Sequence, residues 1–92
     1  MIESFQNKAL RKFYEKGIRS GLNQGHVPRI RRILTQLEAA SDIHDLAEPS
    51  FGLHALQGRL KGFWAKEVSG NWRIIFRIEN GIVYDVDYLD YH

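Results

Sequence analysis

Five side chains in the second half of the sequence could together cut an RNA backbone without a metal: His54, Arg73, Asp90, Tyr91 and His92. In that reaction the substrate's own 2′-OH attacks the phosphate. The protein must then supply a base, an acid for the leaving oxygen, and positive charge for the phosphate. Histidine suits proton transfer because its unperturbed pKa lies near neutrality. The residue types therefore suit a metal-free nuclease, with Tyr91 also able to stack on an unpaired base.

The same residues have a plainer interpretation. The end of a chain is often frayed, and a lone histidine such as His92 there is usually idle. Tyr91 could simply be a strand aromatic. His26 lies in a glycine-rich loop and His44 in an acidic turn, so both are predicted to be surface residues without a role. The sequence has no metal-ligand spacing, phosphate-binding glycine loop or nucleophile elbow, so no metal or cofactor is predicted.

The basic residues are concentrated at the beginning of the sequence. The net charge is only +2, but the only acidic residues among positions 1–34 are Glu3 and Glu15. Basic blocks favour a polyanionic partner and salt-dependent binding, although solvated helix faces are usually charged as well. The side chains that could form an RNA-binding surface are Lys8, Arg11, Lys12, Lys16, Arg29, Arg31 and Arg32.

Length and composition predict one domain over residues 1–92. No apolar run is long enough to cross a membrane, and the opening residues lack the basic and apolar regions of a signal peptide. The sequence has no cysteine, which excludes disulfides and cysteine–zinc sites. These features fit a protein of the reducing cytoplasm with no membrane partner.

Hydrophobic periodicity predicts the elements that must position the candidate residues. Apolar residues recur at helical spacing over 7–17 and 27–40, and 42–46 could add a helical turn. From residue 62 the period changes to two, which predicts strands over 63–68, 72–78 and 82–88, and the first residues could form a short strand. The predicted fold class is α+β, with two N-terminal helices packed on one face of a small, twisted, mainly antiparallel sheet. The other face is predicted to be open and to form a platform for a ligand. It carries Arg73, Arg77, Glu67, Asp85 and Asp87.

The register of the last hairpin is predicted from the cost of burying charge. A three-residue loop over 79–81 would place Ile78 opposite Ile82 and turn Asp85 and Asp87 away from the apolar face. A two-residue turn would instead bury both carboxylates, which is unfavourable. The loop therefore predicts an apolar face made of Trp72, Ile74, Phe76, Ile78, Ile82, Tyr84, Val86 and Tyr88.

The same reasoning sets the register of the preceding hairpin. A three-residue loop over 69–71 places Val68 opposite Trp72 and Glu67 opposite Arg73. Lys66 then falls on the apolar face. We expect an edge position, from which its aliphatic stem could carry the ammonium group out to water.

Four segments of the sequence, taken together, resemble the HigB-type toxins, which belong to the RelE-like superfamily of bacterial toxin–antitoxin systems. They are Leu53-His54-Ala55-Leu56-Gln57-Gly58, Lys61-Gly62-Phe63-Trp64, Asn71-Trp72-Arg73-Ile74-Ile75-Phe76 and Asp90-Tyr91-His92. The opening Met1-Ile2-Glu3-Ser4-Phe5 and the overall length are also similar. The resemblance therefore covers essentially the whole chain and implies a single RelE-like toxin domain.

The resemblance implies an activity and a set of partners. Toxins of this type are ribosome-dependent endoribonucleases that cut mRNA in the decoding site. A cognate HigA-type antitoxin with a helix-turn-helix domain holds them inactive, and the complex binds operator DNA. The basic helices would then face ribosomal RNA, and the open sheet face would receive mRNA. A non-catalytic RNA- or ribosome-binding module and a repressor-complex subunit with decayed nuclease activity remain as alternatives.

The resemblance also implies site residues. The family's active-site positions match His54, Asn71, Arg73, Asp90, Tyr91 and His92 in this sequence. We assign Arg73 to the phosphate and favour Asp90 with His92 as the acid–base pair, leaving open which is the acid. Some members have a lysine where this chain has Gln57, which would weaken phosphate binding. Arg59 or Lys61 could supply the missing positive charge.

Overall fold

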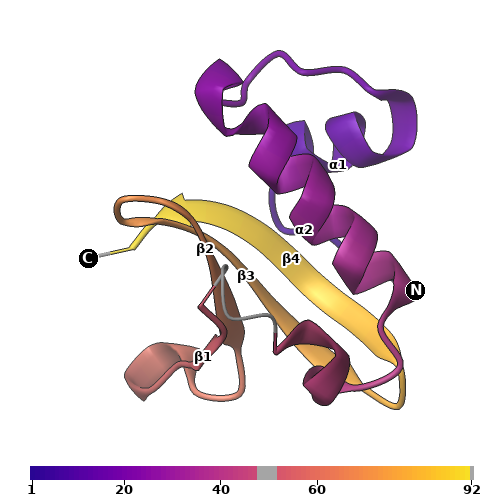
Figure 1. Ribbon diagram of the computed structural model, residues 1–92, viewed down its shortest axis with the longest axis vertical. Helices are drawn as coiled ribbons and strands as arrows, with labels where there is room; N and C mark the ends of the chain where they lie inside the picture. The colour runs from indigo at the N-terminus through magenta and orange to yellow at the C-terminus, as the bar shows by residue number, and fades with distance from the viewer. Residues whose placement is uncertain (48–51, 92) are drawn as a thin grey trace.

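The computed structural model describes residues 1–47 and 52–91, which form two helices and a four-stranded antiparallel sheet. Figure 1 shows both helices on one side of the sheet, with the turn that follows the short first strand on the other side. The strands lie in the order β1-β2-β3-β4. This arrangement confirms the predicted α+β class. The elements are α1 (Lys8–Lys16), α2 (Val27–Ala39), β1 (His54–Ala55), β2 (Trp64–Ser69), β3 (Trp72–Glu79) and β4 (Ile82–Asp90).

The helices begin and end close to where the sequence predicts. At the start of α1 the Asn7 side chain accepts a hydrogen bond from the Leu10 amide at 2.8 Å, and the helix ends at Gly17 with a φ of 70°. Glycine adopts this left-handed conformation without a steric penalty. Pro28 lies in the first turn of α2, where no backbone donor is needed. The core contains the buried residues of α1 and α2, which are Leu10, Phe13, Val27, Ile30, Ile33, Leu34 and Leu37. The predicted extra turn is the 3₁₀ turn Ile43–Leu46.

The register predicted for the β3–β4 turn was wrong. The turn has two residues, Asn80 and Gly81, with φ angles of 53° and 76°, and Ile78 lies opposite Val83 instead of Ile82. Val83 is therefore fully buried, whereas Ile82 is half-buried. Two successive left-handed residues match the twist of a tight hairpin, which favours this turn over the longer loop.

A β-bulge explains how the two-residue turn avoids burying the aspartates. The register shifts between Ile75 and Arg77, and on the facing strand Asp85 has a φ of 56°. One extra residue in β4 returns the later side chains of the strand to the faces predicted for them, so that Val86 and Tyr88 are buried. The Asp85 backbone amide donates to Ser4 Oγ at 2.9 Å. The predicted register assumed a regular ladder without this bulge.

The expected N-terminal strand is reduced to two isolated parallel bridges beside β4, Ile2 with Val83 and Phe5 with Val86. The bulge residue Asp85 lies between these bridges and interrupts the ladder. The Gln6 side chain donates to Asp85 Oδ1 at 3.0 Å, so the opening segment also holds the bulge in place.

Lys66 is fully buried, so the prediction that its ammonium group reaches water was wrong. Its Nζ donates to Gln36 Oε1 at 3.0 Å and to the Leu46 carbonyl at 2.8 Å. A buried ammonium is tolerated only where acceptors surround it, and here α2 and the 3₁₀ turn Ile43–Leu46 provide them. Of the two pairings predicted for this hairpin, Glu67 opposite Arg73 was correct and Val68 opposite Trp72 was wrong. Trp72 faces Ser69, because the register shifts between Glu67 and Ser69.

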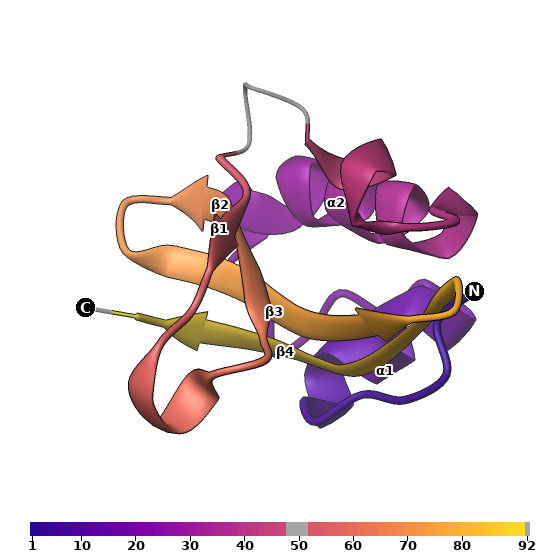
Figure 2. The ribbon, with the colours of Figure 1, turned by 90° about the horizontal axis from the view of Figure 1, so that it is seen from below.

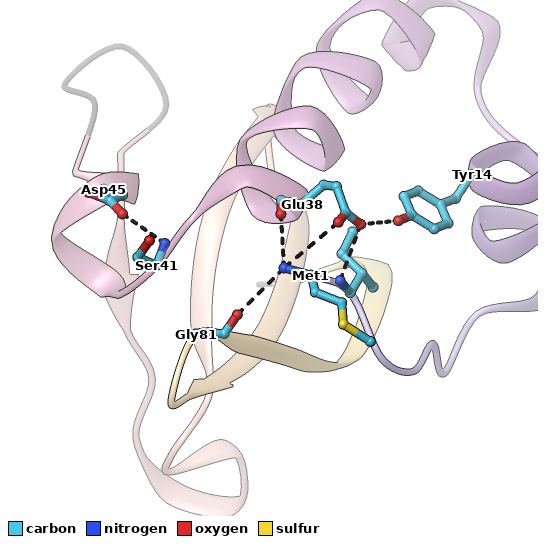
Figure 3. A network of polar contacts seen from close by, with 7 residues as sticks. Met1, Tyr14, Glu38, Ser41, Asp45 and Gly81 are labelled. Atoms are coloured by element: carbon cyan, nitrogen blue, oxygen red, sulfur yellow. Dashed lines mark hydrogen bonds and ion pairs between the residues drawn. The ribbon is translucent and has the colours of Figure 1, made fainter.

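A polar network joins α1, α2 and the N-terminal segment (Figure 3). Glu38 Oε1 accepts hydrogen bonds from the Tyr14 hydroxyl and, at 3.3 Å, from the Ile2 amide. The Glu38 carbonyl accepts from the Met1 amine at 2.8 Å. The hydrogen bond to Glu38 is the main reason that the pKa of Tyr14 rises to about 12, and the same bond lowers the pKa of Glu38.

Replacing Glu38 by glutamine is expected to lower the melting temperature at pH 7 by roughly 1–5 °C, because the network is largely exposed to solvent. A lowered carboxyl pKa stabilises the fold above the unfolded-state pKa and loses this contribution as the pH falls. The difference from wild type should therefore shrink below about pH 4. Thermal unfolding across this range measures it, with Glu3→Gln as the control. An equal difference at pH 3 and pH 7 would contradict the role of the Glu38 charge.

Candidate active site

The outer face of the sheet, on the side away from the helices, brings together candidate residues from β1, β2 and β3. Glu67 lies directly opposite Arg73, and His54 lies opposite Ala65, two residues from Glu67 on the same side of β2. Glu67 Oε1 is 3.6 Å from Arg73 Nη2 and 4.0 Å from His54 Nε2. The sheet therefore places His54 and Arg73 around one carboxylate.

Arg73 is held at the β2–β3 turn. Its Nη1 donates to the carbonyl of Gly70 at 2.6 Å and to that of Trp72 at 3.1 Å, while Nη2 faces Glu67. Only 17% of the side chain is exposed. A guanidinium fixed in this way can present its remaining N–H groups to a phosphate with little loss of conformational entropy.

The outer face is not the fully open platform that the sequence predicts. Leu56, Ala65 and Ile75 are buried there in a second hydrophobic cluster, against which Leu60, Phe63 and Leu89 pack. Ile75 is only 3% exposed, although the alternation of the strand assigns it to the face without helices. The segment between β1 and β2 covers this part of the sheet (Figures 1 and 2). This part of the face is covered because the segment contains apolar residues that pack against the sheet. The polar site is therefore confined to the neighbouring edge of the outer face.

Three of the residues predicted to bind substrate, Gln57, Arg59 and Lys61, line two different hollows. One, of about 380 Å³, is lined by Gln57, Arg59, Leu60 and Tyr91. Lys61 instead lines a hollow of about 670 Å³ together with Arg77, Phe63 and Asp85. Arg59 is thus the basic residue that shares a hollow with Gln57.

The predicted residues near the end of β4 lie on two sides of the sheet. Tyr91 is 39% exposed on the outer side, and its amide donates to the Asn71 carbonyl at 2.8 Å. Asp90 is opposite Trp72, so strand alternation assigns it to the side of the helices, at an exposed position. His92 lies outside the described residues. The Asp90–His92 pair therefore stays a prediction.

His26 is not the idle surface residue that the sequence predicts. It is half-buried, and its Nδ1 lies 2.7 Å from the Tyr88 hydroxyl. Its ring also meets Trp72 edge-on, with the centroids 5.8 Å apart, while Trp72 stacks on Tyr88. Burial raises the pKa of Tyr88. No local pattern reveals a contact between residues 62 positions apart. His44 is exposed as predicted, 3.5 Å from Asp42.

The two helices that carry the basic residues lie on the opposite side of the sheet from this outer face (Figures 1 and 2). Arg29 is half-buried, while Lys8, Arg11, Lys12, Lys16, Arg31 and Arg32 are exposed. Arg31 lies over the Phe13 ring at 5.5 Å. The sequence did not predict the hollow of about 490 Å³ between α1 and α2, which is lined mainly by apolar surface from Phe13, Tyr14, Leu34 and Ala39.

Within residues 1–47 and 52–91, no group of three histidine, cysteine or acidic side chains could hold a metal ion. None of the helices there has the length and apolar character needed to cross a membrane.

Comparison with known proteins accounts for this combination of fold and residues. A family model described as the RelE-like toxin of the type II toxin–antitoxin system HigB matches residues 3–92. The chain belongs to the HigB-like toxin family. This HigB-like toxin is 40% identical to Endoribonuclease HigB of Proteus vulgaris over 92 residues, which cover the whole of both chains.

Solved structures of more distant proteins share the fold of this HigB-like toxin. A YoeB–YefM complex from Staphylococcus aureus matches with a TM-score of 0.64 and 16% identity, covering 100% of this chain and 95% of that one. A YafQ mutant from E. coli matches with a TM-score of 0.53 and 17% identity, covering 95% and 87%. At these identities the likeness concerns the fold alone.

Proposed function

We propose that this HigB-like toxin is an endoribonuclease that cuts mRNA on the ribosome in the cytoplasm and so blocks translation. Family membership and the similarity to Endoribonuclease HigB support a nuclease. The observation that carries the proposal is the position of Arg73, which lies on the outer face of the sheet within reach of the same carboxylate as His54. Cation and imidazole are two of the group types that metal-free RNA cleavage needs.

The proposed reaction uses the 2′-OH of the substrate as nucleophile. Its oxygen bonds to the adjacent phosphorus as the bond to the 5′ oxygen breaks, leaving a 2′,3′-cyclic phosphate and a 5′-OH. Arg73 stabilises the charge on the phosphate, while one base removes the 2′ proton and one acid protonates the leaving oxygen. We assign these proton transfers to His92 with Asp90, and keep His54 and Tyr91 as the other candidates. Tyr91 and Arg59 line the hollow that could receive a nucleotide beside Gln57 and Asn71.

The proposed partners follow from membership in a toxin–antitoxin family. A cognate HigA-type antitoxin with a helix-turn-helix domain would hold the enzyme inactive, and operator DNA would be bound through that complex. The exposed basic residues of α1 and α2 would contact ribosomal RNA, since they form a surface separate from the nuclease site.

Cleavage of one mRNA with and without ribosomes tests the proposed function. We expect primer-extension products only with ribosomes.

Affinity for ribosomes should fall by roughly 10³-fold between low and moderate salt if six phosphate contacts form. A variant in which Lys12 and Lys16 are both changed to glutamine should show a weaker dependence of ribosome affinity on salt than wild type. Ribosome binding without cleavage would instead support the non-catalytic module, an alternative that the uncharged Gln57 suggests. Ribosome binding that does not change with salt would contradict the proposed contact between the helices and ribosomal RNA.

A further inference from the structure

Glu67 is an anionic side chain in a site that is proposed to bind an anionic phosphate. A single oxygen, Oε1, faces both His54 Nε2 and Arg73 Nη2, at 4.0 and 3.6 Å. The resemblance to HigB-type toxins assigns no role to this position. The presence of a carboxylate beside a proposed phosphate site is therefore not accounted for by the resemblance.

The neighbouring backbone also restricts the Glu67 side chain. Continuing the β1–β2 register beyond His54 and Ala65 brings Gly52 opposite Glu67. A Cβ at Gly52 would lie 3.1 Å from Glu67 Cδ, closer than ordinary contacts allow, and Gly52 has a φ of +54° that favours glycine. Glycine at this position thus leaves room for the carboxyl group between β1 and β3. The packing, the strand register and the close approaches of Oε1 to Arg73 and His54 agree on one location for Glu67.

A carboxylate so close to the phosphate site could act in two ways. It would repel the substrate if its only effect were its charge, because like charges at short range disfavour binding. It would favour catalysis if it held Arg73 and His54 in place, because a restrained catalytic group loses less entropy when the transition state forms. The shared oxygen and the additional anchoring of Arg73 at the turn favour the second effect.

We propose that Glu67 is a positioning residue of the nuclease site, which holds Arg73 and His54 in place on the outer face through one carboxylate oxygen. This inference rests on the proposed nuclease function. Glu67 does not touch the reacting atoms in this proposal. It acts by fixing the side chains that do.

The full-length Glu67→Gln variant tests the proposal, because glutamine keeps the shape of the side chain and removes its charge. On ribosome-bound mRNA, we expect kcat to fall by roughly tenfold while KM stays constant or decreases, since two groups lose their restraint and a repulsive charge is removed. Glu67→Asp, which keeps the charge, should recover part of kcat. The matched control is Glu79→Gln, which removes an exposed carboxylate at the far end of β3 and should retain wild-type kcat and KM.

The outcomes separate this proposal from its alternatives. An unchanged or increased kcat in Glu67→Gln would overturn it and show that the carboxylate only repels substrate. A loss of kcat that matches a lower melting temperature, and is not recovered in Glu67→Asp, would overturn it in favour of a merely structural role. In a variant that already carries Arg73→Ala and His54→Ala, adding Glu67→Gln should have no further effect on the residual cleavage. A full additional tenfold loss would contradict the proposal that Glu67 acts through Arg73 and His54.

A measurement independent of cleavage separates failure of this inference from failure of the proposed function. In NMR spectra of the whole protein, Glu67→Gln should shift the side-chain nitrogen resonances of His54 and Arg73 and increase the mobility of the Arg73 guanidinium. If the wild-type protein fails to cut mRNA, the nuclease function fails, and the spectra still report whether Glu67 restrains its neighbours. Unchanged His54 and Arg73 resonances would overturn the positioning role whatever the cleavage assay gives.

Discussion

Replacing Arg73 by alanine is expected to reduce cleavage of ribosome-bound mRNA by roughly 10²–10³-fold. The variant removes the cation proposed to stabilise the phosphate, and it leaves the Gly70 and Trp72 carbonyls at the exposed turn free to bind water. The melting temperature should therefore change far less than the rate. Primer extension under single-turnover conditions measures the loss, and ribosome binding measured in parallel should be only somewhat weaker.

A matching substitution, His92→Gln, tests the proposed proton transfer at the end of the sequence. If His92 handles a proton, cleavage should fall by roughly 10²–10⁴-fold with little change in stability or ribosome binding. His44→Ala is the control, because His44 is exposed and lies 3.5 Å from Asp42, a residue outside the proposed site. Full activity in His92→Gln would remove this residue from the mechanism. Full activity in both His92→Gln and Arg73→Ala would contradict the nuclease mechanism itself.

The largest effect on stability is expected from Lys66→Ala, at about 3 kcal/mol or more. The substitution removes the donor for Gln36 Oε1 and the Leu46 carbonyl and leaves a cavity between the sheet and α2. For a domain of this size the melting temperature should fall by roughly 12–24 °C.

Two further variants divide this effect into its parts. Lys66→Met fills most of the volume but donates no hydrogen bond, so its loss of stability should be smaller than that of Lys66→Ala. Lys8→Ala, at an exposed position of α1, should stay within about 0.5 kcal/mol of wild type. Chemical denaturation gives all three free energies of unfolding. Equal stabilities of Lys66→Ala and Lys8→Ala would show that the buried hydrogen bonds contribute nothing.

The sequence was sufficient for elements whose signals are local. The helices follow from apolar spacing together with Asn7, Gly17 and Pro28 at their ends. The pairing of Glu67 with Arg73 was also predicted, from the position of the turn between the strands, and it brings opposite charges together across the two strands. These local signals defined the fold class and brought Arg73 to the outer face.

Other features depend on contacts between distant segments. The bulge at Asp85 requires Ser4 as a hydrogen-bond partner, 81 positions away. Burial of Lys66 requires a carbonyl from the 3₁₀ turn and an amide from α2, which no pattern within β2 can reveal. For the candidate site, the sequence named His54, Arg73 and Tyr91, but the position of Glu67 beside His54 depends on where β1 and Gly52 lie. Tertiary packing decided each of these features.

The bridges between residues 2–5 and β4 also bear on how quickly the protein folds. They join positions about eighty residues apart, so the intervening chain must give up much of its freedom before either bridge can form. The apolar sides of α1 and α2 likewise remain exposed until the later strands assemble against them. Folding should therefore be slower than in a helical bundle of the same length, on a scale of roughly milliseconds to seconds. During that interval the chain would be a ready substrate for chaperones and proteases.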